Sequence, residues 1–95
     1  MNWRVNRIEL EQGVVMLDCP GLCRDTFPAL AEGLLQEWEL GLVDKEWGAD
    51  RHSWRLEFEG SQLRLEYEHY SGCWLAAVQP ADREVVIWLG RQHKD

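Results

Sequence analysis

Residues 54–68, WRLEFEGSQLRLEYE, contain two runs in which apolar and polar side chains alternate, and Gly60-Ser61 separates the runs. A period of two is typical of a β-strand with one buried face. Glycine at the first position suits a two-residue hairpin turn. The sequence therefore predicts an antiparallel hairpin in this region. Its apolar face would carry Trp54, Leu56, Phe58, Leu63, Leu65 and Tyr67.

A turn at Gly60-Ser61 also predicts the register of this hairpin. The predicted partners are Phe58 with Leu63, Leu56 with Leu65, Trp54 with Tyr67, Arg55 with Glu66, and Glu57 with Arg64. Apolar pairs would share one face and opposite charges the other, an agreement that a slip by one residue would destroy. Catalytic carboxylates need environments that push their pKa values apart. We therefore interpret Glu57 and Glu66 as part of a solvated, ion-paired surface.

A second tight turn, at Ser71-Gly72, would add a further strand to this sheet. The register of that turn places Trp74, Ala76 and Val78 on the core face, and Cys73, Leu75 and Ala77 on the outer face. The outer face of this strand would be less polar than that of its neighbours, which suggests that another element covers it.

The N-terminal region predicts another hairpin, with its turn at Gln12-Gly13. This turn would pair Leu10 with Val15 and Ile8 with Leu17. Trp3 and Val5 have the opposite parity, which predicts a bulge or an irregular start of the first strand.

Residues 27–38 are predicted to form an amphipathic helix. Apolar residues recur there at helical spacing, namely Phe27, Leu30, Ala31, Leu34, Leu35 and Trp38. Asp25 or Thr26 can cap the start of the helix, and Pro28 fits its first turn. Gly41 is predicted as the left-handed residue beyond its end.

Residues 81–92 fit two structures. Val85-Val86-Ile87 has the β-branched character of a strand. Acidic residues before this segment and basic residues after it match a helix macrodipole, and on that ground we prefer a helix. The chain is therefore predicted to be a single α+β domain over residues 1–95, in the order strand–strand–helix–strand–strand–strand–helix. One or two helices would pack on one face of a mostly antiparallel sheet whose strand order stays open.

The composition excludes some partners. Seventeen Asp and Glu residues against ten Lys and Arg give a net charge of −7, which disfavours binding to nucleic acid and to anionic membranes. No apolar run approaches the roughly 20 residues of a membrane-spanning helix, and the N-terminus does not resemble a secretory signal. Three cysteines without such a signal favour a reducing compartment. We therefore predict a soluble, cytoplasmic protein.

No catalytic motif is found: there is no nucleophile elbow and no glycine-rich phosphate loop, so we favour a non-enzymatic protein without a cofactor. Cys19 and Cys23 lie four residues apart in a loop. With Cys73 they suggest an alternative, a metal- or thiol-dependent protein, although zinc sites usually contain two paired motifs. His52 and His69 would face each other in the predicted hairpin register.

Tryptophan is abundant, with six residues, and Trp47 lies in an acidic segment without helical or alternating period. We interpret this segment as a loop in which Trp47, Glu46 and Asp44, together with Glu39, bind a basic protein partner, because tryptophan dominates interface hot spots. The leading hypothesis is a protein-binding or regulatory module. Trp47 could instead fold back over the core as a lid. Self-association through an exposed sheet edge, or through the face that carries Cys73, Leu75 and Ala77, is a further hypothesis.

Overall fold

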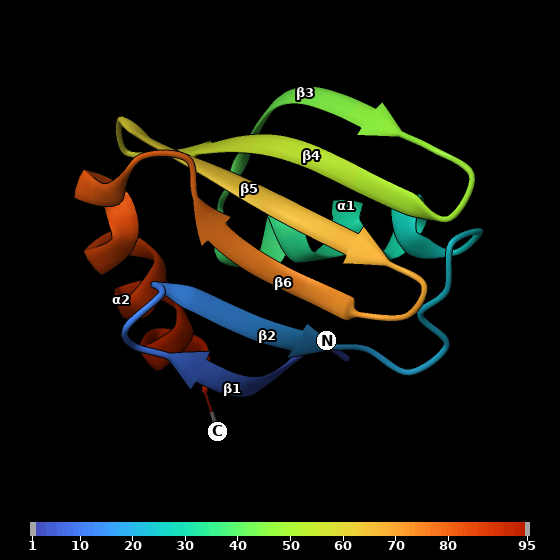
Figure 1. Ribbon diagram of the computed structural model, residues 1–95, viewed down its shortest axis with the longest axis horizontal. Coiled ribbons are helices and arrows are strands. Elements are labelled where there is room, and N and C mark those ends of the chain that lie inside the picture. The colour runs from blue at the N-terminus through green and yellow to red at the C-terminus, as the bar shows by residue number, and fades with distance from the viewer. Residues whose placement is uncertain (1, 95) are drawn as a thin grey trace.

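Six strands form one antiparallel sheet in the computed structural model, which describes residues 2–94 (Figure 1). The strands are β1 (Arg4–Glu9), β2 (Val14–Asp18), β3 (Gly41–Trp47), β4 (Arg51–Phe58), β5 (Ser61–Glu68) and β6 (Gly72–Ala77). Their order across the sheet is β1-β2-β6-β5-β4-β3, and every neighbouring pair is antiparallel. The last strand along the chain, β6, therefore joins the N-terminal hairpin to the β3–β5 meander.

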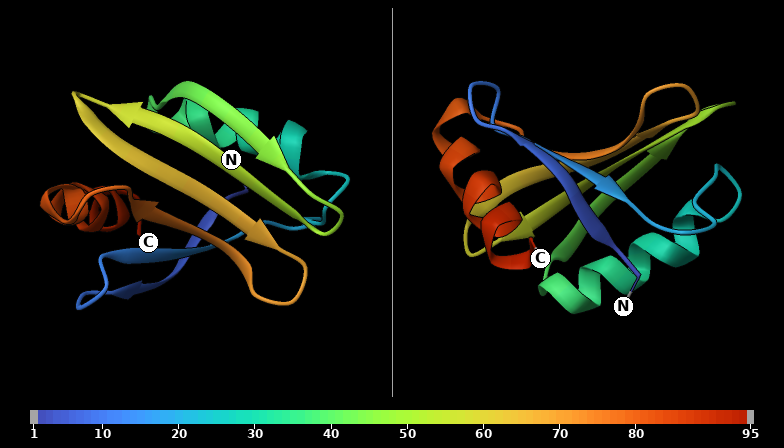
Figure 2. Two further views of the ribbon diagram at one scale, coloured as in Figure 1. Left: turned by 45° about the horizontal axis from the view of Figure 1, so that its top comes forward. Right: turned by 90° about the horizontal axis from the view of Figure 1, so that it is seen from below.

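Two helices pack on the same face of this sheet, α1 (Phe27–Trp38) and α2 (Arg83–His93), as Figure 2 shows. A short 3-10 turn, η1 (Pro80–Asp82), precedes α2. The apolar faces of both helices join the inner side chains of the sheet in a single hydrophobic core. The α+β class and the helical interpretation of residues 81–92 are confirmed.

The register predicted for the β4–β5 hairpin is wrong. The turn residues are Glu59 and Gly60, with φ of 49° and 90°, rather than Gly60 and Ser61. The observed partners are Trp54 with Leu65, Leu56 with Leu63, Phe58 with Ser61, Arg55 with Arg64, and Glu57 with Gln62. Positive φ at both turn residues matches the twist of the flanking strands. Because the shift is two residues, each side chain keeps its face, but the predicted ion pairs across the strands do not form.

The register predicted for the β5–β6 hairpin is also wrong, and here the faces are exchanged. Gly72 has a φ of 88° and pairs with Glu68, so the connection is a longer loop of residues 69–71. The register differs from the predicted one by an odd number of residues, so the side chains of β6 exchange the inner and outer faces of the sheet. Cys73 and Leu75 are consequently buried in the core, and Trp74 lies on the outer face.

The N-terminal hairpin has a four-residue connection, residues 10–13, instead of the predicted two-residue turn. Ile8 pairs with Val15, Val5 pairs with Leu17, and Leu10 is exposed in the connection. The predicted irregularity is confirmed, since the register shifts between Val5 and Arg7.

Helix α1 matches the predicted residues, but its last turn ends differently. Glu39 has a left-handed backbone with φ of 57°, and the Leu40 N–H donates to the Leu35 carbonyl at 2.9 Å. Glu39 therefore has the role predicted for Gly41, which is instead the first residue of β3.

The segment predicted as a loop around Trp47 is the edge strand β3. All seven of its residues are exposed, and its pairing with β4 shifts between Leu42 and Asp44. A strand whose residues are all exposed does not require apolar and polar residues to alternate. The register shift also interrupts the period of two, so the sequence of β3 lacks the usual strand pattern. Trp47 is 68% exposed, so it does not form a lid over the core.

Trp54 and Phe27 lie at the centre of the core. The Phe27 ring meets the Trp54 ring edge-on at 5.3 Å and stacks on the buried His52 ring at 4.8 Å. His52 pairs with Tyr67, so the predicted opposition of His52 and His69 is wrong.

Candidate functional site

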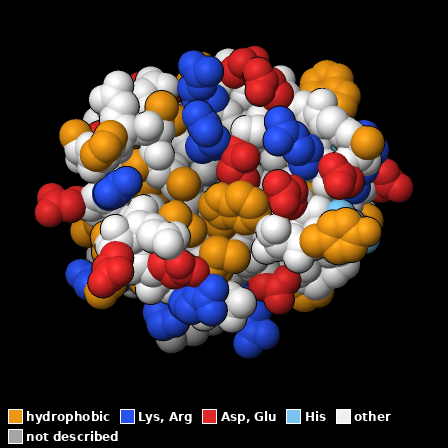
Figure 3. All heavy atoms as spheres, viewed as in Figure 1, with side chains coloured by type: hydrophobic (Ala, Val, Ile, Leu, Met, Phe, Trp, Pro, Cys, Tyr) orange, Lys and Arg blue, Asp and Glu red, His pale blue; other side chains and the backbone are white. Residues whose placement is uncertain are grey.

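The outer face of the sheet has an apolar centre with charged surroundings (Figure 3). Val14, Met16, Trp74 and Ala76 form this centre, where β2 pairs with β6, and all four are half-buried. Beside it, a depression of about 210 Å³ lies over β3, β4 and β5. It is lined by Asp44, Glu46, Arg51, Ser53, Arg55, Arg64 and Glu66.

Charges in this depression balance each other. Three arginines and three carboxylates line it. Arg64 Nε lies 3.9 Å from Glu66 Oε2, and Ser53 Oγ donates to the same carboxylate. Two of the sequence-predicted site residues, Asp44 and Glu46, belong to this balanced set. The depression therefore has no excess charge with which to attract a basic partner.

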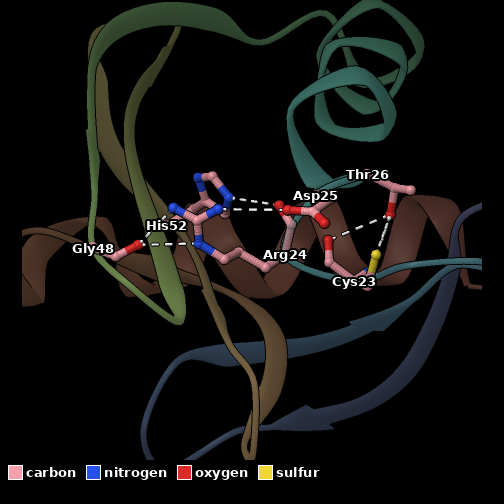
Figure 4. A network of polar contacts seen from close by, with 6 residues as sticks. All are labelled: Cys23, Arg24, Asp25, Thr26, Gly48 and His52. Atoms are coloured by element: carbon pink, nitrogen blue, oxygen red, sulfur yellow. Dashed lines mark hydrogen bonds and ion pairs between the residues drawn. The ribbon is translucent and has the colours of Figure 1, made fainter.

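Trp47 lies on the other side of β3, because it pairs with the buried His52 while Asp44 and Glu46 pair with residues of the outer face. The loop before α1 holds this end of the sheet (Figure 4). Arg24 Nη2 donates to the Gly48 carbonyl at 3.0 Å, and His52 Nε2 lies 2.8 Å from the Arg24 carbonyl. A carbonyl only accepts, so His52 Nε2 carries the proton. The predicted site residues thus do not form one surface.

Glu39, the fourth predicted site residue, lies at the opposite end of the sheet in a groove. The end of α1, the β4–β5 turn and α2 form this groove. Its larger part, about 380 Å³, is lined by Glu37, Trp38, Glu39, Phe58, Glu59, Trp88, Leu89 and His93. Its smaller part, about 260 Å³, is lined by Phe58, Glu59, Glu84, Val85 and Trp88. The two parts share Phe58, Glu59 and Trp88, and we call them together the acidic groove.

The acidic groove has a strongly negative rim. Its lining includes four glutamates, Glu37, Glu39, Glu59 and Glu84, and no lysine or arginine. Within residues 2–94, Glu39, Glu59 and Glu84 form no ion pair. The C-terminus of α1 adds the negative end of its macrodipole, and no basic residue lies in its last turn. This surface is therefore suited to a cation.

Aromatic rings form the walls of the acidic groove. Trp38 is buried, and the His93 ring stacks on it at 4.2 Å with an interplanar angle of 8°. Trp88 is 51% exposed, and its ring lies 6.0 Å from the Phe58 ring at 33°. Of the two groove tryptophans, Trp88 thus presents the larger open surface.

Comparison with protein families identifies a match along nearly the whole chain. The model of the family described as "Protein of unknown function (DUF3630)" matches residues 3–94. The chain belongs to the DUF3630 family. No curated protein and no solved structure matches the chain. Every residue that lines the acidic groove falls inside the span matched by the DUF3630 model.

Sequence reasoning found only the acidic half of this groove. It included Glu39 among the predicted partner-binding residues, but it did not identify Trp88, Phe58 or Glu59 as site residues. One signal was available for Trp88: at 100° per residue its position on α2 points away from the buried Val86, Leu89 and Gly90. Nothing in the sequence indicates that this side of α2 meets the end of α1.

Among the residues that the structure describes, the three cysteines do not form a metal centre with neighbouring ligands. Across residues 2–94, no group of three or more His, Cys, Asp or Glu side chains is arranged to hold a metal ion. Cys19 and Cys73 are buried, and burial raises the pKa of both thiols. Cys23 is exposed, and hydrogen bonds from the Thr26 hydroxyl and from backbone N–H groups lower its pKa.

Cys23 should therefore be the reactive thiol of the folded protein. Iodoacetamide is expected to modify Cys23 first, with Cys19 and Cys73 reacting only after unfolding, because the thiolate is the nucleophile. A lowered pKa means that the pH midpoint of the modification rate lies below that of a cysteine without these hydrogen bonds. Mass spectrometry of timed samples at several pH values measures this midpoint. Thr26→Val removes the largest cause and should raise it, whereas equal midpoints in both proteins would contradict the assignment.

None of the helices described within residues 2–94 has the length and hydrophobicity needed to span a bilayer.

Proposed function

We propose that this chain is a non-enzymatic protein-binding module whose acidic groove receives a basic segment of a partner protein. The observation that carries the proposal is Trp88, a half-exposed tryptophan between Glu39, Glu59 and Glu84, none of which has an ion-pair partner within residues 2–94. Tryptophan is enriched among the residues that dominate binding energy. The net charge of −7 favours the approach of a basic partner.

Electrostatics explains why a cation would be favoured at this groove. Carboxylates that share one surface repel each other, and water screens this repulsion only in part. A bound lysine or arginine side chain removes the repulsion and gains charge-assisted hydrogen bonds. The balanced depression on the outer face offers less gain, because three arginines line it together with its three carboxylates and Arg64 lies 3.9 Å from Glu66.

Self-association through β3 has less support than a basic partner. Antiparallel pairing of β3 with a second β3 brings residues of the same face opposite each other. Asp44 and Glu46 share the outer face, so this pairing would oppose carboxylate to carboxylate. Charged side chains on an edge strand are a common means of preventing such contacts.

The proposal is tested by binding assays with matched surface variants. The intact protein and the variants Trp88→Ser, Trp47→Ser and Tyr70→Ser are used as bait in extracts of cells that contain the protein naturally. Tyr70 is 89% exposed in the β5–β6 loop and is the control for removing an exposed aromatic ring. We expect the wild type to retain a protein of net positive charge, and Trp88→Ser to lose it while Tyr70→Ser retains it.

The same assay separates the two candidate anchors. If Trp47→Ser fails to retain the partner while Trp88→Ser retains it fully, the binding surface lies at the end of β3 and not in the acidic groove. Equal retention by all four proteins would contradict both assignments. Direct titration with the purified partner should show affinity that falls with added salt, because exposed charges are screened.

A further inference from the structure

The two parts of the acidic groove differ in chemistry. The larger part has three carboxylates, from Glu37, Glu39 and Glu59, around aromatic walls. The smaller part has the apolar side chains of Phe58, Val85 and Trp88, with carboxylates from Glu59 and Glu84. An occupant that fills both parts therefore needs a cation and an apolar group next to each other.

Trp88 lines both parts, as Phe58 and Glu59 do, and its indole ring can contact both groups of such an occupant. The ring of Trp38 is covered by the stacked His93 ring, whereas half of the Trp88 surface is open. Phe58 lies tilted beside Trp88 and does not stack on it. A tryptophan face is the best aromatic partner for a cation.

The chain already contains a contact of this kind within its own fold. Lys45 Nζ lies 4.4 Å from the centre of the Trp54 ring and 3.5 Å from Glu32 Oε2 of α1. A cation is thus held between an indole ring and a carboxylate of α1. In the acidic groove, Trp88 and Glu39, which caps the end of α1, offer the same two groups without a cation from residues 2–94.

The chemistry of the two basic side chains favours arginine over lysine here. A guanidinium is planar, so it can stack on an indole and donate two parallel hydrogen bonds to a carboxylate at the same time. A guanidinium is also more weakly hydrated than an ammonium group, so it loses less hydration free energy when it enters the groove. The ammonium group of lysine is a point charge, so it cannot stack on the indole and donate two parallel hydrogen bonds to the carboxylate.

We infer that the acidic groove recognises an arginine next to a large apolar residue in an exposed segment of a partner protein. The guanidinium stacks on Trp88 and bonds Glu39 or Glu59, and the apolar neighbour fills the part lined by Val85. This inference rests on the proposed function, because it specifies which basic segment the groove receives.

The test uses four short peptides, acetylated and amidated, that differ only at two central positions. These positions are Leu-Arg, Leu-Lys, Leu-citrulline and Ala-Arg. Each peptide is titrated into the intact protein, and the indole N–H signal of Trp88 is followed by NMR, with Trp88→Phe for its assignment. Citrulline keeps the shape of arginine without its charge, so it isolates the electrostatic contribution.

We expect the Leu-Arg peptide to shift the Trp88 signal with the lowest Kd. The Kd should rise by about threefold or more for Leu-Lys, as expected for a cation–π and bidentate contact at a partly exposed site. Leu-citrulline should lose most binding, and Ala-Arg should be weaker than Leu-Arg. Glu59→Gln should weaken the Leu-Arg peptide, whereas Glu46→Gln, which removes the same charge from the outer face, should leave its Kd unchanged.

Each other outcome contradicts a defined part of the idea. Equal Kd values for Leu-Arg and Leu-Lys, with no binding of Leu-citrulline, would overturn the selection of arginine but leave a cation-binding groove. Equal weakening by Glu59→Gln and Glu46→Gln would overturn the location in the groove. No shift of the Trp88 signal with any peptide would overturn the inference, whereas the binding assay with Trp88→Ser decides the proposed function separately.

Discussion

Trp54→Ala is expected to lower the free energy of unfolding by about 3–5 kcal/mol, the usual cost of removing a large aromatic side chain from a core. Trp54 is 1% exposed, and its ring contacts Phe27 edge-on on the α1 side of the sheet. Its neighbours on β4 and β5 are themselves fixed in the sheet, so they cannot close the cavity. Domains of this size have a total stability of roughly 5–15 kcal/mol, so the variant should lose a large fraction of its stability.

Urea unfolding followed by circular dichroism measures this loss, and Trp88→Ala is the matched control. The control removes the same atoms from a side chain that is 51% exposed, so its cost should be about half that of Trp54→Ala. Fluorescence is a poor probe here, because both variants remove an emitting residue. Similar losses in the two variants would mean that the core is not centred on Trp54.

Gly90→Ala is expected to lower the free energy of unfolding by about 1–2 kcal/mol, although alanine is the better helix former. A Cβ at position 90 would lie 2.6 Å from Val15 Cγ2 and 3.2 Å from Ile8 Cδ1. The gain in helix propensity is at most about 1 kcal/mol, whereas overpacking a core costs about 1–3 kcal/mol. Val15 is completely buried, so its methyl group cannot move aside into solvent, and α2 must move away from β1 and β2.

A double-mutant cycle with Val15→Ala tests this explanation. Val15→Ala alone leaves a cavity, but it removes the methyl group that the new Cβ would meet. The two changes together should therefore cost less than the sum of the single changes, by about 0.5–3 kcal/mol as for other residues in contact. Strictly additive costs would show that Gly90 does not set the distance between α2 and the sheet.

Prediction from sequence succeeded where a structure depends on neighbours along the chain. The span of α1 follows from the helical spacing of its apolar residues, and the charge order at the ends of residues 81–92 correctly favoured a helix over a strand. The inner and outer faces of β4 and β5 were also correct, because alternation within one strand is a local property.

Prediction failed where a structure depends on backbone angles within a turn. Glu59 with a φ of 49° moved the β4–β5 turn by one position along the chain, and the partners across the strands changed by two. The sequence does not distinguish the predicted turn, Gly60-Ser61, from the observed turn, Glu59-Gly60, because both contain Gly60. The longer β5–β6 loop had a larger effect, because it exchanged Trp74 for Cys73 and Leu75 in the core.

For the candidate site, the sequence predicted that Glu39, at the end of α1, belongs to an acidic binding surface, but it did not predict that Trp88 does. Only the packing of both helices against the β4–β5 turn decided that Glu39, Glu59 and Trp88 border one groove, and that Asp44 and Trp47 lie on opposite sides of a strand. The physical reason is the distance along the chain over which each kind of interaction acts. Helical and strand periods act between residues a few positions apart, whereas this groove joins elements separated by tens of residues, whose approach is set by the shared core.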